Sequence, residues 1–552
     1  MNKRNRLIPL LVIVLALSVS ATFAVGVGQP ITAFEGDGHG NADYITASQL
    51  KDYLYFIASD EMRGRRTPSR GLDTVAKFLA TNLSRWGLRP AGDDGSYFQQ
   101  IELERHRVDS AATTVKINGQ SFAYGDGFLA SPTVAELSGP LVYVGHGWVI
   151  KAKEIDPYEG IDVAGKIMVI AGGGLPKGVT FADIRAGVRG EDWIQPLAYA
   201  VKNGALGVIV VPSFQTLSRW QRSLESAQQR GSVRVVAFED QGNAEVPTIT
   251  ASVPMVSALF QGEERNATAI FNGVASREPG ESFDLDAAKT VNISIAVDTD
   301  TVTTQNVVAL LEGGEPELRS EYVAIGAHYD HVGVGSPVNG DSIYNGADDD
   351  GSGTTAVLAI AEAFSHGPRP KRSILFVWHC GEEVGLWGAR YFTEHPTVPL
   401  DKIVAQLNID MIGRSKAEGD TSRANRDLTG PNEIYLIGPK VMSDELGEIV
   451  EAVNRSYLDL GINHRYDDID EPSRFFFRSD HFNYAHKGIP IAFFFDGVHA
   501  DYHRPSDSPD KIDYQKMEKV ARTIYATAWT LGNREGRPGL NQVLPEELQR
   551  WP

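Results

Sequence analysis

The sequence has little cysteine, no extended basic block and few long apolar runs. Cys380 is the only cysteine among 552 residues, so no disulfide can form within the chain and its stability must have other sources. Acidic residues outnumber basic residues by 71 to 52, giving a net charge of −19, and we therefore expect no nucleic-acid partner. Glycine-rich segments at residues 172–174 and 333–335 lack the lysine and the spacing of phosphate-binding loops.

The one membrane-length apolar run lies at the N-terminus. Basic residues within positions 3–6 precede an apolar stretch at residues 7–17, and small residues follow around Ala21 and Ala24. This pattern predicts a Sec-type signal peptide over residues 1–24 and a secreted or periplasmic protein. An uncleaved N-terminal anchor is the less favoured alternative. We expect no stable membrane span after cleavage.

Residues that can bind divalent metals lie at or near the ends of short apolar runs. The runs at residues 322–327, 373–378, 404–409 and 491–495 predict buried strands of a parallel sheet. Because the carboxyl ends of such strands form the ligand crevice of an open α/β sheet, side chains far apart in sequence can converge there. The metal-binding candidates are His328, Asp349, Glu383, Asp410 and His503.

The chemistry of these five side chains favours a pair of zinc ions. Imidazole and carboxylate ligands suit zinc, and also accept cobalt or manganese, whereas an oxygen-only set would favour magnesium or calcium. Five ligands serve two ions and leave room for water only if one carboxylate bridges both. Asp349 is the natural bridge, because it lies in the tight turn GADDDGSG at residues 346–353, just before a predicted helix at 354–364.

The motifs around these residues resemble those of the zinc aminopeptidases of peptidase family M28, in the form that carries an inserted protease-associated (PA) domain. Six short motifs occur in the family's order within roughly residues 45–535. They are HYD at 328–330, GADDDGSG at 346–353, GEEVGL at 381–386, NIDMIG at 408–413, RSDH at 478–481 and YH at 502–503.

The resemblance implies a role for each matching residue. It implies one metal held by His328, Asp349 and Asp410, and a second held by Asp349, Glu383 and His503. Glu382 then takes the place of the general base, which activates a water that bridges the two metals. Asp330 is expected to accept the second ring N–H of His328 and fix its tautomer.

The resemblance has two further consequences for the site. It implies a cis peptide bond between Asp349 and Asp350. Some relatives have a tyrosine three residues before the Ser-Asp-His motif, but this chain has Phe476, so a phenolic oxyanion donor is missing there. The neighbouring Phe475, Phe476 and Phe477 are candidates for the wall of an apolar substrate pocket, although an aromatic run is more often part of a core.

Other polar residues near the motifs are interpreted as structural. We expect surface or packing roles for His331, His379, His395, His481 and His499, and a buried, unreactive thiol for Cys380. The spacing of His499 and His503 makes His499 the easiest residue to mistake for a ligand. The family pattern selects His503.

The chain is too long for one compact core. We expect an α/β fold whose mixed, mostly parallel sheet is flanked by helices, as in zinc-peptidase and phosphorylase-like proteins. A β-rich PA domain is expected as an insert at residues 131–285, resembling that domain around YEGIDVAGKI at 158–167. The catalytic domain would then comprise residues 43–130 and 286–540.

The resulting hypothesis is a secreted di-zinc aminopeptidase that acts on peptides with a free N-terminus. Its alternatives are a carboxypeptidase of the glutamate carboxypeptidase kind, which needs arginine or lysine to bind a free carboxylate, and a one-zinc glutaminyl cyclase. A non-catalytic, receptor-like binding protein is a third alternative. The complete set of five ligands together with Glu382 argues against the last two. Oligomeric state is not predicted.

Overall fold

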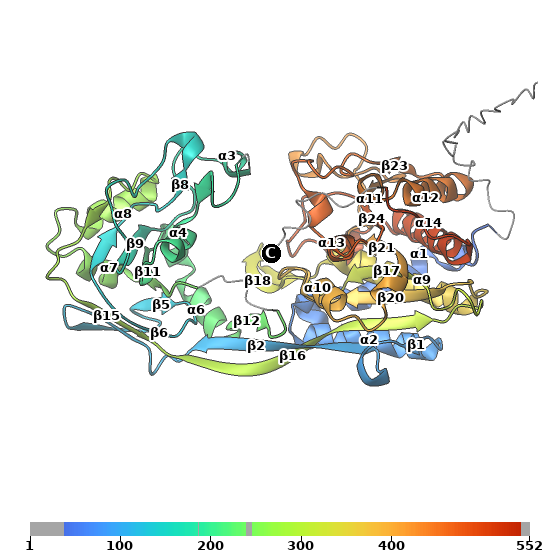
Figure 1. Cartoon of the computed structure of the whole chain (residues 1–552), viewed down its shortest axis with the longest axis horizontal. Coiled ribbons are helices and arrows are strands. Elements are labelled where there is room, and N and C mark those ends of the chain that lie inside the picture. The colour runs from blue at the N-terminus through green and yellow to red at the C-terminus, as the bar shows by residue number, and fades with distance from the viewer. Residues whose placement is uncertain (1–37, 186, 239–244, 542–552) are drawn as a thin grey trace, which may run out of the picture.

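The computed structural model describes residues 38–185, 187–238 and 245–541. The predicted signal peptide at residues 1–24 lies outside these ranges. Within them, no helix is both long and apolar enough to cross a membrane. Figure 1 shows two lobes, joined by the long antiparallel strands β2 (Phe98–Val108) and β16 (Val297–Leu311).

The larger lobe is built on a ten-stranded mixed sheet. Its path is β12-β2-β16-β20-β17-β21-β24-β22-β23, and β1 (Arg89–Pro90) pairs with β16. The central strands are parallel and fully buried: β20 (Ser373–His379), β17 (Tyr322–His328), β21 (Ile403–Ile409) and β24 (Ile491–Phe495). The remaining strands are β12 (Ser232–Val235), β22 (Glu433–Ile437) and β23 (Gly461–Asn463). The predicted α/β class is confirmed.

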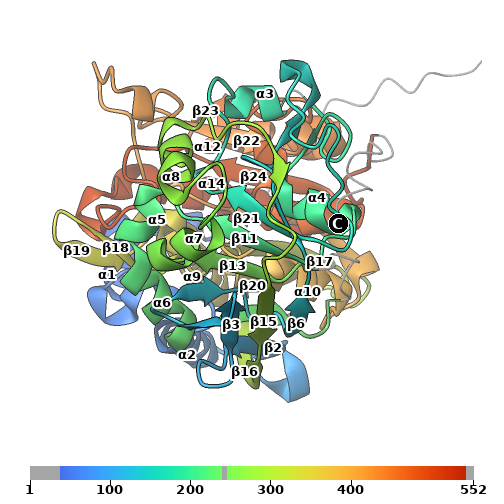
Figure 2. The same ribbon diagram turned by 90° about the vertical axis from the view of Figure 1, so that its left-hand side faces the viewer.

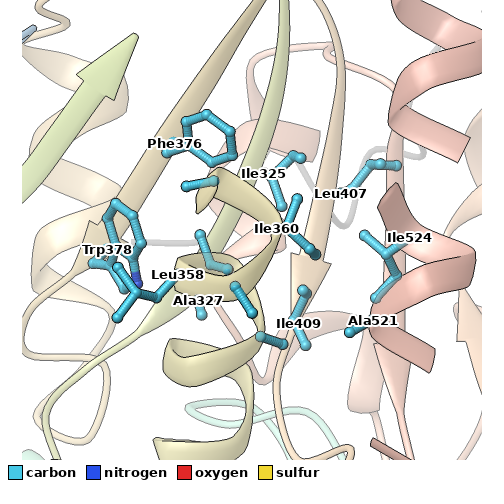
Figure 3. Packing of buried hydrophobic residues seen from close by; sticks show 14 of the residues in the cluster. Ile325, Ala327, Leu358, Ile360, Phe376, Trp378, Leu407, Ile409, Ala521 and Ile524 are labelled. Atoms are coloured by element: carbon cyan, nitrogen blue, oxygen red, sulfur yellow. The ribbon is translucent and has the colours of Figure 1, made fainter. Parts of the chain in front are cut away.

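Helices cover both faces of the central strands, which explains why these strands are apolar throughout rather than alternating. On one face, Ile325, Phe376 and Leu407 pack against Ile360 of α9 and Ile524 of α14 (Figure 3). The helices near this face are α1 (Ala47–Ile57), α2 (Arg70–Arg85), α9 (Gly353–His366), α12 (Asp444–Tyr457) and α14 (Tyr514–Asn533). The other face packs against α10 (Trp387–Glu394) and α13 (His481–His486).

The smaller lobe has its own hydrophobic core. It contains two main sheets (Figures 1 and 2), and a further two-stranded sheet pairs β8 (Val149–Ile150) with β10 (Trp193–Ile194). One sheet has the order β14-β7-β9-β11-β13-β5, and the other β4-β3-β15-β6. The first contains the parallel strands β7 (Leu141–Tyr143), β9 (Ile167–Ala171), β11 (Gly207–Val211) and β13 (Thr248–Ala251), with β5 (Phe128–Ala130) and β14 (Phe283–Asp284) at its edges. The second contains β3 (Thr114–Ile117), β4 (Gln120–Ala123), β6 (Ala135–Ser138) and β15 (Val291–Ile295).

The smaller lobe includes most of residues 131–285 and extends beyond them on both sides, through β3 to β5 and through β15. Its helices include α4 (Pro196–Lys202), α7 (Val253–Leu259) and α8 (Ala267–Ser276). Helix α6 (Trp220–Gln229) faces the large lobe, where Arg222 Nη1 donates to Ser336 Oγ at 2.7 Å on the hairpin of β18 (Gly333–Val338) and β19 (Asp341–Tyr344). Its identity as a PA domain stays a prediction.

Candidate metal centre

Three adjacent parallel strands deliver polar side chains to the same edge of the large sheet. His328 is the last residue of β17, Asp410 follows β21, and Glu382 and Glu383 lie in the turn after β20. Since β20, β17 and β21 are neighbours in register, their carboxyl ends bring these groups together. The order of the strands in the sheet therefore explains why residues far apart in the sequence lie close together here.

Asp349 reaches the same edge from the acidic turn that precedes α9. Asp507 fixes this turn, because its Oδ2 accepts the backbone N–H groups of Asp348 at 3.0 Å and Asp349 at 3.2 Å. Asp350 Oδ1 accepts from the N–H of Met411 at 3.1 Å, which ties the turn to the segment after β21. The Asp349–Asp350 peptide bond is cis, as the family resemblance implied.

Two groups of potential ligands share Asp349. In the first, His328 Nε2 lies 3.4 Å from Asp349 Oδ1 and 3.6 Å from Asp410 Oδ1. In the second, His503 Nε2 lies 3.0 Å from Asp349 Oδ2 and 3.1 Å from Glu383 Oε2. The two oxygens of Asp349 therefore face different groups, which is the geometry that a bridging carboxylate requires.

The donor atoms fit divalent metal ions. Among the described residues, the buried atoms His328 Nε2, Asp349 Oδ2, Glu383 Oε1 and His503 Nε2 have no hydrogen-bond partner. Burying polar atoms without partners is costly, and such a cluster is stable when cations satisfy it. Because the set combines imidazole nitrogens with carboxylate oxygens, zinc suits it better than magnesium or calcium does.

The charges within the cluster are strongly coupled. Burial alone would lower the pKa of His328, but the carboxylates of Asp410 and Glu382 raise it well above its usual range. Burial also opposes protonation of His503, yet the adjacent carboxylates of Asp349 and Glu383 raise its pKa to about 10. Conversely, burial favours the neutral form of Asp349, while His331, His328 and His503 hold its pKa well below the usual value.

Glu382 lies beside the first group without belonging to either. Its Oε2 is 3.9 Å from His328 Nε2, and burial raises its pKa well above that of an ordinary glutamate while His328 opposes the shift. The backbone N–H of Glu382 donates to Asp330 Oδ1 at 3.1 Å. Glu382 is thus a carboxylate that can take up a proton beside the first group of potential ligands.

Asp330 has a broader role than the sequence suggested. Its Oδ1 lies 3.7 Å from His328 Nδ1, while the backbone oxygen of Asp330 is closer to that nitrogen, at 3.3 Å. The same carboxylate oxygen holds the backbone of Glu382. Asp330 therefore links the strand end that carries the ligand His328 to the turn that carries Glu382.

Four of the neighbouring histidines lie outside both groups. His379 contacts Tyr484 Oη at 2.9 Å, His481 contacts the carbonyl oxygen of Phe476 at 2.9 Å, and His499 lies 3.2 Å from Asp348 Oδ2. His395 is exposed. The fifth, His331, is fully buried and belongs to the second group of potential ligands. Cys380 is also buried, and burial raises the pKa of its thiol.

Arg65 supports the site from a segment in which the sequence analysis identified no functional residue. It is completely buried and donates to the carbonyl oxygens of Tyr329, Asn345 and Gly346, at 2.9, 2.6 and 2.9 Å. These carbonyls belong to the loops that carry His328 and Asp349. Only the run of three arginines around Gly64 hinted at this role, and such a run is usually solvent-exposed.

A small pocket lies beside Glu382, Asp349 and Asp410. Its other lining residues are mostly apolar: Met411, Phe475, Phe493, Phe495, Val498, Tyr502 and Arg478. The three consecutive phenylalanines Phe475, Phe476 and Phe477 all belong to the hydrophobic core, and of the three only Phe475 also lines this pocket.

The large lobe is thus an α/β fold with a cluster of potential metal ligands at the carboxyl edge of its sheet. Residues 306–528, less than half of the chain, match the model of peptidase family M28. The match excludes the smaller lobe and the N-terminal helices of the large one.

Curated relatives match a similar share of the chain. The chain is 26% identical over 270 residues to leupeptin-inactivating enzyme 1 of Streptomyces exfoliatus, covering 45% of this chain and 53% of the relative. It is 26% identical over 271 residues to leucine aminopeptidase 2 of Arthroderma otae, covering 45% and 49%. The alignments thus span about half the length of these relatives.

Among solved structures, an aminopeptidase from Aneurinibacillus sp. strain AM-1 superimposes with a TM-score of 0.51 at 19% identity, over 91% of this chain and 97% of that one. A zinc aminopeptidase from Bacillus subtilis gives a TM-score of 0.50 at 16% identity, over 91% and 99%. These similarities establish the fold over both lobes.

Proposed function

We propose that this protein is a secreted aminopeptidase that uses two zinc ions. The observation that carries the proposal is the pair of ligand groups that share Asp349, with Glu382 next to them. His328, Asp349 and Asp410 would hold one ion, and Asp349, Glu383 and His503 the other. The names of the relatives, which include leucine aminopeptidases and zinc metalloproteases, support the same activity.

The bound ions supply Lewis acidity, which polarises the scissile carbonyl and makes water more acidic. The protein supplies the proton transfer: Glu382 accepts a proton from the attacking water and passes it to the leaving amine. The carboxylate of Asp330 accepts the backbone N–H of Glu382 and so limits the conformations available to the turn that carries Glu382. Burial of Glu382 supports this role because it favours the protonated form needed in the second step.

The pocket supports a preference for apolar N-terminal residues. Phe475, Phe493 and Phe495 line it directly beside the ligands, so an aliphatic or aromatic side chain that packs against them would lose water. The hydrophobic gain is about 25 cal/mol per Å² of apolar surface buried. We therefore expect substrates with N-terminal leucine or phenylalanine to exceed those with N-terminal aspartate or lysine in kcat/KM.

Hydrolysis of aminoacyl-p-nitroanilides tests the activity. Purified protein would be assayed on free and N-acetylated substrates, before and after chelation and with zinc restored, beside Glu382→Gln. Zinc-dependent cleavage of free-amine substrates alone is expected. Cleavage of the acetylated substrates, or no cleavage by protein that holds two zinc ions, would defeat the aminopeptidase proposal.

One observation favours a second candidate, a carboxypeptidase. Arg478 lines the same pocket, with its guanidinium 4.8 Å from the ring centroid of Phe475, and an arginine there could bind a free carboxylate. N-acetylated dipeptides with a free C-terminus separate the candidates. A carboxypeptidase would cleave them and lose this activity in Arg478→Gln, whereas an aminopeptidase would not cleave them.

We also propose that the smaller lobe is a PA-type domain that selects substrates by length. Its contacts with the hairpin of β18 and β19 support the idea, because this hairpin follows His331 closely in the chain. Replacing Arg222 and Arg230 by alanine removes the donors to Ser336 Oγ and to the carbonyl oxygen of Val334. We expect a several-fold change in KM for long peptides and none for aminoacyl-p-nitroanilides. Equal effects on both would indicate a structural role only.

A further inference from the structure

His331 has the position of a ligand, although the family pattern assigns it no such role. Its Nδ1 lies 2.7 Å from Glu383 Oε1 and 3.7 Å from Asp349 Oδ2, and its ring is fully buried. Within the described residues neither ring nitrogen makes a hydrogen bond of acceptable geometry. A buried imidazole next to two carboxylates with no directed hydrogen bond is what a metal-binding histidine leaves when the ion is removed.

The surrounding residues form a defined space for this ring. Gly346 adopts a left-handed backbone with φ of +56°, and a Cβ at this position would lie 2.4 Å from Cγ of His331. A side chain there is therefore incompatible with the imidazole. On another side the ring meets that of His503 edge to face, with centroids 5.5 Å apart. The two imidazoles thus approach the carboxylates from different directions.

We propose that His331 is an additional ligand of the second zinc ion, binding through Nδ1 together with Asp349, Glu383 and His503. The inference rests on the zinc-binding part of the proposed function. It makes the two half-sites unequal, because the second ion gains four protein ligands whereas His328, Asp349 and Asp410 supply three to the first. Closed four-ligand sets are typical of firmly held zinc, and three-ligand sets keep a position for exchange. The second ion should therefore be the one retained during chelation.

Two substitutions distinguish ligation from simple support of Glu383. His331→Asn puts an amide N–H close to the place of Nδ1, where it can donate to Glu383 Oε1, but an amide is a poor zinc ligand. His331→Leu removes both capacities at similar volume. His481→Asn serves as the matched control, because His481 is an equally buried histidine outside both ligand groups.

Zinc binding is measured by competition with a chelator and by metal content per chain. For the intact protein we expect two ions of unequal affinity. We expect both His331 variants to lose more than about 100-fold in affinity for the tighter ion. Loss of a residue that only supports a ligand has a smaller effect on metal affinity. The control should retain both affinities. Binding of both ions by His331→Asn with unchanged affinity would overturn the proposal and leave His331 as a support for Glu383.

A measurement on the intact chain covers the case in which the variants do not fold. X-ray absorption of protein carrying only the tighter zinc should show two imidazole nitrogens on the ion, and a single one would overturn the proposal. Cobalt in the same site should likewise show the visible absorption of a four-ligand centre, which His331→Asn alters. Failure of the intact protein to bind two ions would count against the proposed function itself, and is distinguishable because it needs no variant.

Discussion

Both lobes contain a parallel sheet, yet only one of them carries ligands at the carboxyl ends of its strands. In the large lobe, β17, β20 and β21 are followed by imidazole and carboxylate groups. In the small lobe, β9 is followed by three glycines at residues 172–174, β11 by Pro212 and Ser213, and β13 by Ser252. Among the described residues, both groups of potential metal ligands lie in the large lobe.

The two strand edges solve the problem of unpaired polar groups in different ways. Ser213 Oγ accepts the backbone N–H of Thr216, and Ser252 Oγ accepts that of Met255, so both serines satisfy the first turn of a short helix. In the large lobe the corresponding polar atoms are buried without partners. A parallel sheet therefore provides a place for chemistry, but the residues after each strand decide whether that place is used.

Substitution of Glu382 by glutamine should have the largest effect. We expect kcat to fall by about 10³-fold, within the range for loss of a general base, while zinc content and melting temperature stay close to those of the unchanged protein. Ser213→Ala, at the equivalent edge of the small lobe, should leave kcat unchanged and cost about 1 kcal/mol of local stability. Steady-state kinetics and metal analysis check both variants.

The difference between the two edges would be lost if Ser213→Ala reduced kcat as strongly as Glu382→Gln. If Glu382→Gln bound only one zinc ion per chain, Glu382 would instead be a metal ligand. Its role would then no longer differ from that of Glu383.

A buried cation in each lobe extends the comparison. Arg65 binds backbone carbonyls at the metal loops, whereas Lys289 in the small lobe binds the carbonyl oxygens of Leu259 and Gln261 and the carboxylate of Glu263. Replacing either cation by methionine leaves buried acceptors without a donor. We expect a loss of about 3 kcal/mol in unfolding free energy for each.

The two methionine variants should differ in their effect on zinc. Arg65→Met should weaken zinc binding about tenfold or more, because it frees the loops that carry His328 and Asp349. Lys289→Met should leave zinc binding and cleavage of aminoacyl-p-nitroanilides unchanged. Denaturant unfolding and chelator competition provide the measurements. A zinc defect in Lys289→Met would show that the lobes are energetically coupled.

The sequence predicts the central strands well, because they depend on a local pattern, and the five candidate ligands lie together in two groups at the sheet edge. Apolar runs of six residues, each followed by a polar residue, predicted β17, β20 and β21 close to their observed limits. The buried positions of Arg65 and His331 beside the ligand groups could not be predicted in this way. Both depend on contacts between segments distant in the chain, such as Arg65 with Asn345, and neither residue lies in a periodic pattern that signals burial.

The limits of the small lobe were also difficult to predict. Its second sheet combines β3 and β4, which precede residue 131, with β15, which follows residue 285. The alternation in these short strands resembles that of any half-buried strand, so composition does not indicate which lobe they join. In the structure, β15 pairs with both β3 and β6, and these pairings join the strands outside residues 131–285 to the small lobe.

The smallest effect is expected at the opposite end of the large sheet, where carboxylates form ion pairs with arginines. Glu321 precedes β17 and accepts from Arg372 Nε at 2.7 Å and from Arg537 Nη2 at 2.8 Å. Although burial by itself raises the pKa of Glu321, these two arginines lower it below 4.5. The ion pair thus stabilises the fold fully above the pKa of the unfolded chain, and this contribution is lost as the pH falls through the folded value.

Glu321→Gln should therefore lower the melting temperature at neutral pH by the equivalent of about 1 kcal/mol, with activity per folded molecule unchanged. The difference from the unchanged protein should shrink below about pH 4.5, since protonation of Glu321 then has the same effect as the substitution. Glu312→Gln is the matched control, because Glu312 is exposed and lies 3.7 Å from Arg319. A fall in kcat for Glu321→Gln at neutral pH would mean that the two ends of the sheet are coupled. Catalysis at the carboxyl edge would then depend on more than the residues that follow its strands.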